Sequence, residues 1–373
     1  MSNSYDIAVV GAGAIGCSIS YYLSKLGLKV ALIDENSISS GASAHATGFL
    51  SNSHELHIDP SISDLLFSSS DLFFQDLPEI SEISQIDPLC VNREGLRLAL
   101  SEEENQELIT RCKLGKMRNN YPFEFLTSDE VHKLDSRLSE NVTGAGLIPR
   151  ESQLDSYKFT LSLAVASEKL GTTIYQRSVT GIVEMDNKVV GVQCENENIY
   201  ASNVVLCLGA GTNNLLQYLP TNFFINLLKG QSIRMQYSGE PMQYHIGGVN
   251  SWHLISRGDD LISAGSTSEF GNSYEYPNQN STQNILTWVM SVMPCLQDAH
   301  IVETMHGFRP MSPDDIPIVG RIPGKSNLYV ATGHGHKGIH LSLVTGVIIS
   351  ELISKGFSTY NYAFMDPIRF TEE

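Results

Sequence analysis

The chain has 373 residues and a formal net charge of −17, with 24 Lys and Arg against 41 Asp and Glu. At about 150 residues per domain this length predicts two or three domains. The hydrophobic content of 42% is that of a globular protein rather than a disordered one. The negative charge argues against binding to nucleic acid and against docking on anionic lipid.

Cysteine usage and hydropathy indicate a reducing compartment. The six cysteines are scattered singly, without a CxxC pair or the Cys/His spacing of a metal site. Residues 1–16 lack the basic start of a signal peptide, and no apolar stretch has the length of a membrane span. We therefore expect a cytoplasmic protein with no metal and no transmembrane segment.

The chain begins with the pattern of a dinucleotide-binding unit. An apolar run at residues 5–10 predicts a buried strand, and the segment GAGAIG follows at 11–16. Residues 17–27 predict a helix, and a second apolar strand at 29–33 ends in acidic residues. Strand, GxGxxG, helix, strand and acid in this order are typical of dinucleotide binding, and a lone GxGxxG would be much weaker evidence.

Each glycine of this motif has its own physical reason. Gly11 permits the tight turn, Gly13 lets the backbone approach a pyrophosphate, and Gly16 lets the helix pack against the strand. The free N–H groups at the start of the helix attract the anion. Asp34 is placed to accept ribose hydroxyls, and the neighbouring Glu35 is the alternative.

A stretch of small residues follows at 39–53 (SSGASAHATGFLSNS). It has too little bulk for a core element. Its composition suits a backbone that wraps a flat, bulky ligand and equally suits a plain surface loop, so both interpretations stay open here.

Later motifs resemble those of the flavin-dependent D-amino-acid oxidase superfamily, which includes glycine oxidase, sarcosine oxidase and D-amino-acid dehydrogenases. They are VVLCLGAGTNN at 204–214, GFRPMSPDDIPIVG at 307–320, NLYVATGHGHKGIHLSLVTG at 327–346 and DPIRF at 366–370. Together with the N-terminal unit they follow the family's order and span residues 5–370, which is more specific than any single motif.

The resemblance implies an α/β fold in which a Rossmann-like FAD-binding domain is interleaved with a mostly antiparallel β-sheet substrate domain. The expected FAD-binding domain comprises residues 1–85, 141–222 and 305–373, and the substrate domain comprises 86–140 and 223–304. FAD would lie between them, where ligand clefts commonly form.

The resemblance also implies which residues hold the cofactor. Backbone and side-chain contacts are expected from Gly11, Gly13, Ala14, Ile15, Gly16, Asp34, Glu35, Ser43, Ala46, Thr47, Gly48, Val179, Gly209, Gly211, Arg309, Gly333, His334, Gly335, His336, Lys337, Gly338 and Ile339. The helix that follows residues 333–338 would direct its N-terminal dipole at the pyrimidine end of the flavin, where negative charge builds on reduction.

Arg309 stands where glycine oxidase and D-amino-acid oxidase have the arginine that binds the substrate carboxylate. A guanidinium offers two parallel donors to a carboxylate and would fix the substrate against the flavin. The competing interpretation is a structural ion pair with the nearby Asp314 or Asp315.

Histidines and one glycine complete the candidate site. His45, His253 and His336 are candidate catalytic residues. His45 and His336 could stabilise reduced flavin or activate dioxygen, although each could equally be a solvated or hydrogen-bonding side chain. His253 lies on a predicted strand of the substrate domain, and it or His45 would be the base if the substrate were a hydroxy acid. Monomeric sarcosine oxidases attach flavin through a cysteine, and Gly307 occupies that position here. We therefore expect non-covalent FAD.

The rest of the chain is predicted from its periodicity. Residues 56–140 predict helices and connecting turns, and the helix at 128–134, started at Ser128, lacks a full capping box. An amphipathic helix is predicted at 156–170, followed by strands up to residue 209. Residues 223–305 predict a mostly antiparallel sheet with one helix at 281–294.

The resemblance implies oxidation of the C–N bond of a small amino acid, such as glycine, sarcosine or another D- or N-methyl amino acid. Hydride would pass to flavin N5 and leave an imine that hydrolyses, with dioxygen or another electron acceptor as the second partner. A FAD-dependent 2-hydroxy-acid or polyol dehydrogenase is the first alternative. The second is a flavin-carrying subunit of a multi-subunit amine oxidase or dehydrogenase; a homo-oligomer is a further possibility.

Overall fold

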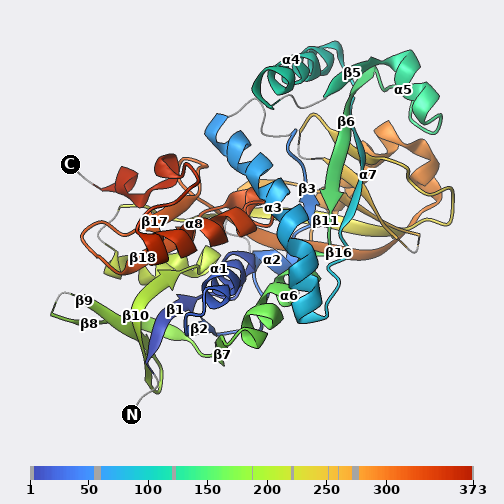
Figure 1. Cartoon of the computed structure of the whole chain (residues 1–373). Helices are drawn as coiled ribbons and strands as arrows, with labels where there is room; N and C mark the ends of the chain where they lie inside the picture. The colour runs from blue at the N-terminus through green and yellow to red at the C-terminus, as the bar shows by residue number, and fades with distance from the viewer. Residues whose placement is uncertain are drawn as a thin grey trace.

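The computed structural model describes residues 4–53, 60–119, 123–186, 188–219, 222–250, 252–258, 260–270 and 277–371. It is a mixed α/β fold built around two β-sheets, each with helices packed against it (Figure 1). The expected fold class is confirmed: a Rossmann-like sheet and a second, mostly antiparallel sheet are interleaved along the chain.

The first sheet has the predicted dinucleotide unit at its centre. Its strands are β1 (Tyr5–Val10), β2 (Val30–Asp34), β7 (Thr173–Gln176), β8 (Val179–Met185), β9 (Lys188–Cys194), β10 (Asn198–Leu206), β17 (Ile318–Arg321) and β18 (Leu328–Thr332). The order β17-β18-β10-β1-β2-β7 is parallel apart from β17, and the β8–β9 hairpin pairs antiparallel with β10.

The continuous apolar sequence of β1 reflects burial on both faces of this sheet. Ile7 and Val9 point into one core, whereas Ala8 and Val10 point into the core on the opposite face, beside the β8–β9 hairpin. Successive strand residues face opposite sides, so a strand buried on both faces must be apolar throughout. The first face is covered by α1 (Ala14–Lys25), α6 (Ser156–Lys169) and α8 (Ser342–Lys355).

The second sheet lies to one side of the first and carries its own core under α7 (Gln279–Val292) (Figure 1). Its strands are β3 (Phe49–Leu50), β4 (Val91–Ala99), β5 (Glu124–Thr127), β6 (Gly144–Gln153), β11 (Asn226–Gln236), β12 (His245–Gly248), β13 (His253–Gly258), β14 (Leu261–Gly265), β15 (Glu269–Phe270) and β16 (His300–Met311). The order is β15-β11-β14-β13-β12-β4-β6-β3, with β16 on β11 and β5 on β6. All pairs are antiparallel except β12 beside β4, which is parallel.

The region from residue 56 to residue 140 corrects the sequence prediction. Its helices are α3 (Pro60–Ser84), α4 (Glu102–Asn119) and α5 (Ser128–Leu134), but it also contains strands β4 and β5, which we had not predicted. The polar first half of β4 hides its alternation, because only its second half is buried. The capping prediction was also wrong: the cap is Thr127, and its box is completed by Glu130. Residues 56–59 and 120–122 lie outside the described residues.

Short elements complete the fold. The small-residue segment forms a helix, α2 (Ala42–His45), and the strand β3, rather than irregular backbone alone. The remaining elements are the 3-10 helices η1 (Gly209–Tyr218), η2 (Pro294–Asp298), η3 (Gly335–Lys337), η4 (Ala363–Met365) and η5 (Pro367–Phe370). None of the helices within the described ranges is both long and apolar enough to cross a bilayer.

The chain passes between the two sheets several times. β6 belongs to the segment 141–222 that we assigned to the FAD-binding domain, and it pairs with β4 in the second sheet. The domain boundaries given above stay a prediction.

Candidate active site

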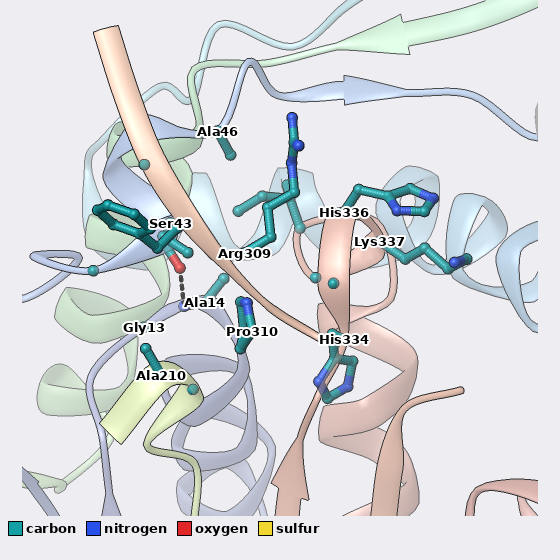
Figure 2. Close-up of a pocket in the computed structure, with 18 of the residues that line it drawn as sticks. Gly13, Ala14, Ser43, Ala46, Ala210, Arg309, Pro310, His334, His336 and Lys337 are labelled. Carbon is teal, nitrogen blue, oxygen red and sulfur yellow. Dashed lines mark hydrogen bonds between the residues drawn. The ribbon is translucent and has the colours of Figure 1, made fainter. Parts of the chain in front are cut away.

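A cavity of about 870 Å³ lies between the two sheets. Its lining includes Asp34 and Val179 of the first sheet and Arg309 and His253 of the second. Figure 2 shows Arg309 between the loop that carries Ala46 and the turn that carries His336. A cavity of this volume, lined by residues of both sheets, suits a large cofactor with a small substrate beside it.

The predicted Gly-rich turn forms one wall of the cavity. Gly11 has a φ of 108°, and a Cβ there would come within 2.4 Å of the Cys207 carbonyl oxygen. A Cβ at Gly16 would come within 1.9 Å of the Gly11 carbonyl oxygen, so Gly16 allows α1 to pack on the turn and does not itself line the cavity. Gly13 precedes α1 and faces the cavity.

Two side chains of the cavity wall accept hydrogen bonds from the backbone around the start of α1. The Ala14 N–H donates to Ser43 Oγ at 3.0 Å, across the cavity wall (Figure 2). The Ala12 N–H donates to Asp34 Oδ2 at 2.7 Å, and the Asn36 N–H donates to the other oxygen at 2.8 Å. Asp34 is thus held at the end of β2, where it lines the cavity together with Glu35.

The turn after β18 forms the opposite wall. Residues 333–339 all line the cavity, in a 3-10 turn followed by α8, which begins at Ser342. His336 is exposed at the rim, and Lys337 is buried. The ring of His334 is directed away from Arg309 (Figure 2) and bonds Thr345 Oγ1 at 3.1 Å. Burial, followed by the charge of Lys337, lowers the pKa of His334 to about 3, so this ring is neutral.

Arg309 is held by three consecutive residues after β14. Its Nη2 donates to Ser266 Oγ at 2.7 Å, and its Nη1 donates to the Thr267 carbonyl at 3.1 Å and to Ser268 Oγ at 3.2 Å. The guanidinium crosses Gly230 of β11, where a Cβ would come within 2.5 Å of Nη2. Burial lowers the pKa of Arg309 to about 10, which leaves it charged at neutral pH.

The competing interpretation of Arg309 as a structural ion pair is not what the structure shows. Asp314 instead accepts from Arg369, at 2.8 Å between Oδ2 and Nε. Within the described part of the chain, Arg309 makes no ion pair with any carboxylate. It is therefore an available cation in the cavity wall.

The candidate histidines have different surroundings. His45 lines the cavity beside Gly307, where a Cβ would come within 2.8 Å of the His45 Cβ, and its ring lies 6.4 Å from that of His306. His253 is buried at the start of β13, with its ring 5.9 Å from that of Phe49.

Several residues around the cavity were not predicted from the sequence. The Ser266–Ser268 clamp carries no motif, and register alone brings it to Arg309. A buried ion pair joins Arg97 Nη2 and Glu151 Oε1 at 2.7 Å, and Arg97 also lies 4.9 Å from the ring of Phe49. These contacts link β4 and β6 to β3, and the only sequence signal for them is a charged residue in each strand.

Apart from Gly16, every residue that we predicted to bind the cofactor lines this single cavity, as do the candidate catalytic histidines. The glycine turn, the N-terminus of α1 and the carboxylate of Asp34 fit the pyrophosphate and ribose of FAD. The residues present therefore suit the cofactor that the resemblance implies.

The comparisons with known proteins agree with this geometry. The family model described as FAD dependent oxidoreductase (DAO) matches residues 6–352. The chain belongs to this family. Glycine oxidase from Geobacillus kaustophilus (strain HTA426) is 26% identical over 364 residues, which are 97% of this chain and 96% of that protein. Glycine oxidase from Bacillus subtilis (strain 168) is 24% identical over 356 residues, covering 95% and 94%.

A solved structure gives the same result. The crystal structure of glycine oxidase from Geobacillus kaustophilus matches with a TM-score of 0.94 at 25% identity and covers 100% of both chains. This FAD-dependent oxidoreductase therefore has the family fold over its full described length.

Proposed function

We propose that this FAD-dependent enzyme oxidises the C–N bond of a small amino acid, such as glycine, sarcosine or another D- or N-methyl amino acid. The observation that carries the proposal is Arg309, a partly buried guanidinium in the wall of the FAD cavity that pairs with no carboxylate of the described chain. The names of its relatives, glycine oxidases, support an amino acid as substrate.

The geometry of Arg309 suits a carboxylate. A guanidinium has five N–H donors, and three of them are used by the clamp at residues 266–268. The Nε–H and one N–H of Nη2 remain for the substrate. Because the clamp fixes the plane of the guanidinium, a bound carboxylate has a defined orientation in the cavity.

The protein's part in the reaction is binding and orientation. When bound, FAD supplies the acceptor for the two electrons of the amine. Arg309 would hold the carboxylate, and the glycine turn and the 333–339 turn would hold the cofactor. We also place the reaction in the cytoplasm, which the six free cysteines support.

The test is an anaerobic titration of the purified holoenzyme, followed by its visible spectrum. We expect glycine, sarcosine or a D-amino acid to bleach the flavin band. Admission of air then distinguishes an oxidase, whose band returns, from a dehydrogenase. Bleaching by 2-hydroxy acids but not by amino acids would replace the proposal with the hydroxy-acid alternative. A flavin band that no substrate bleaches would favour a subunit that depends on a partner.

A further inference from the structure

Strand β13 carries a largely buried arginine near its end, Arg257, which does not line the cavity. Arg257 donates from Nη2 to the Thr47 carbonyl, from Nη1 to the Leu154 carbonyl at 3.0 Å and from Nε to Ser263 Oγ at 3.0 Å. Each of these partners is a neutral oxygen. Burial lowers the pKa of Arg257 to about 10, so the group stays charged at neutral pH, although no carboxylate of the described chain pairs with it.

Its first acceptor belongs to the loop that faces the cofactor cavity. Three consecutive carbonyls of that loop are bonded by groups outside the lining. The Ala46 carbonyl accepts from Ser156 Oγ at 2.6 Å, the Thr47 carbonyl accepts from Arg257, and the Gly48 carbonyl accepts from the Leu154 N–H at 3.0 Å. Ala46, Thr47 and Gly48 all line the cavity.

Gly48 allows the loop backbone to approach Leu154 closely. Its φ is 67°, and a Cβ there would come within 2.0 Å of the Leu154 carbonyl oxygen. The loop therefore lies backbone to backbone against the end of β6. Arg257 crosses this junction from the second sheet and bonds one carbonyl on each side of it, Thr47 and Leu154.

We propose that Arg257 is a positioning residue for the cofactor: it fixes the Ala46–Gly48 wall of the cavity to the second sheet. The proposal rests on the FAD binding included in the proposed function but not on the identity of the substrate. A planar guanidinium can donate to two carbonyls and a hydroxyl at once from three nitrogens, whereas an ammonium donates all its hydrogen bonds from one nitrogen. Lysine at this position should therefore restore only part of the effect.

The test compares the holoenzymes of the wild type, Arg257→Gln and Arg257→Lys. FAD release on dilution is followed by the rise in flavin fluorescence, and hydrogen exchange is followed in peptides covering residues 39–53. We expect Arg257→Gln to weaken FAD binding at least tenfold and to accelerate exchange in these peptides. Arg257→Lys should weaken binding about threefold.

The matched control is Arg137→Gln. Arg137 also joins two segments, through Asp135 and through the Glu240 carbonyl at 2.6 Å, but neither of these partners lines the cavity, whereas Thr47, the partner of Arg257, does. We expect this variant to release FAD at the wild-type rate. Unchanged FAD affinity in Arg257→Gln, or an equal loss in Arg137→Gln, would overturn the proposal.

Two further outcomes are distinguishable. If Arg257→Gln does not fold, Arg257→Lys decides: wild-type FAD release would contradict the proposal, and the threefold loss with faster exchange at residues 39–53 would support it. Because FAD release is measured without substrate, an enzyme that binds FAD and oxidises no amino acid would overturn the proposed substrate class but leave the role of Arg257 intact.

Discussion

The two sheets contribute to the cavity by different physical means. In the first sheet the strands bury apolar residues on both faces, and the cavity is made by backbone at strand ends: the Gly11–Gly16 turn and residues 333–338. In the second sheet the strands bury charged and polar side chains, among them Arg97, Glu151, Lys229, His245 and His253. Of these five, Arg97 and His253 line the cavity, as does Arg309 of the same sheet. The first sheet thus contributes mainly backbone to the cavity, and the second sheet contributes mainly side chains.

The prediction with the largest expected effect tests the backbone contribution of the first sheet. Gly16→Ala would place a Cβ within 1.9 Å of the Gly11 carbonyl oxygen, so α1 must move away from the turn. We expect a loss of about 3 kcal/mol in the free energy of unfolding and no stable FAD binding. Denaturant melts and the flavin content of the purified protein measure both.

Gly356→Ala is the control for this change. Gly356 ends α8 with a φ of 81° and open space around it, so alanine should cost about 1 kcal/mol and leave FAD bound. If Gly16→Ala retained FAD as well as Gly356→Ala does, the close packing of α1 on the turn would not matter for the cofactor.

The second prediction tests the side-chain contribution of the second sheet. Arg309→Met removes the only cation that we assign to the substrate carboxylate. We expect kcat/KM to fall about 1000-fold, or about 4 kcal/mol, with FAD retained, because charge-assisted contacts in a desolvated site are strong. Arg309→Lys should recover part of this loss. Steady-state kinetics with the substrate found in the anaerobic titration measure it, and an unchanged KM would place the carboxylate elsewhere.

The parts of the candidate site that depend on backbone conformation could be predicted from the sequence. The glycines at 11, 13 and 16 imply their turn, because their roles follow from the absence of a side chain, and the acid after β2 follows from the βαβ pattern. The clamp around Arg309 was not predictable. Ser266 meets Arg309 only because β14 and β16 both pair with β11, a long-range register that local periodicity does not encode.

The third prediction concerns the polar interior of the second sheet. His245 is fully buried, and neither ring nitrogen has a hydrogen-bond partner in the described structure. Burial, followed by the charge of Arg93, lowers its pKa to about 4 from an ordinary 6.5. Below pH 6.5 the unfolded chain binds a proton that the folded chain does not, so stability falls as the pH is lowered from 6.5 to 4, by about 3 kcal/mol in all.

His245→Phe should remove this acid sensitivity. We expect the difference in unfolding free energy between pH 7 and pH 4.5 to shrink by about 2 kcal/mol in this variant, and not in the control His300→Gln, whose histidine is exposed on β16. Urea melts at the two pH values measure this. Equal acid losses in the wild type and His245→Phe would show that the buried histidine is not the group responsible.

The smallest expected effect tests the register-dependent clamp. Ser266→Ala removes one acceptor of the Arg309 guanidinium, at 2.7 Å, while the Thr267 carbonyl and Ser268 remain. The loss should be about 1 kcal/mol, a roughly fivefold rise in KM with little change in kcat, because the guanidinium loses orientation but keeps its charge. A double-mutant cycle with Arg309→Met decides whether the effect passes through Arg309. If Ser266 acts by holding the guanidinium, Ser266→Ala should have no further effect once Arg309 is methionine. A full fivefold effect in that background would mean that the serine contacts the substrate directly, and the second sheet would then bind the substrate through more than Arg309.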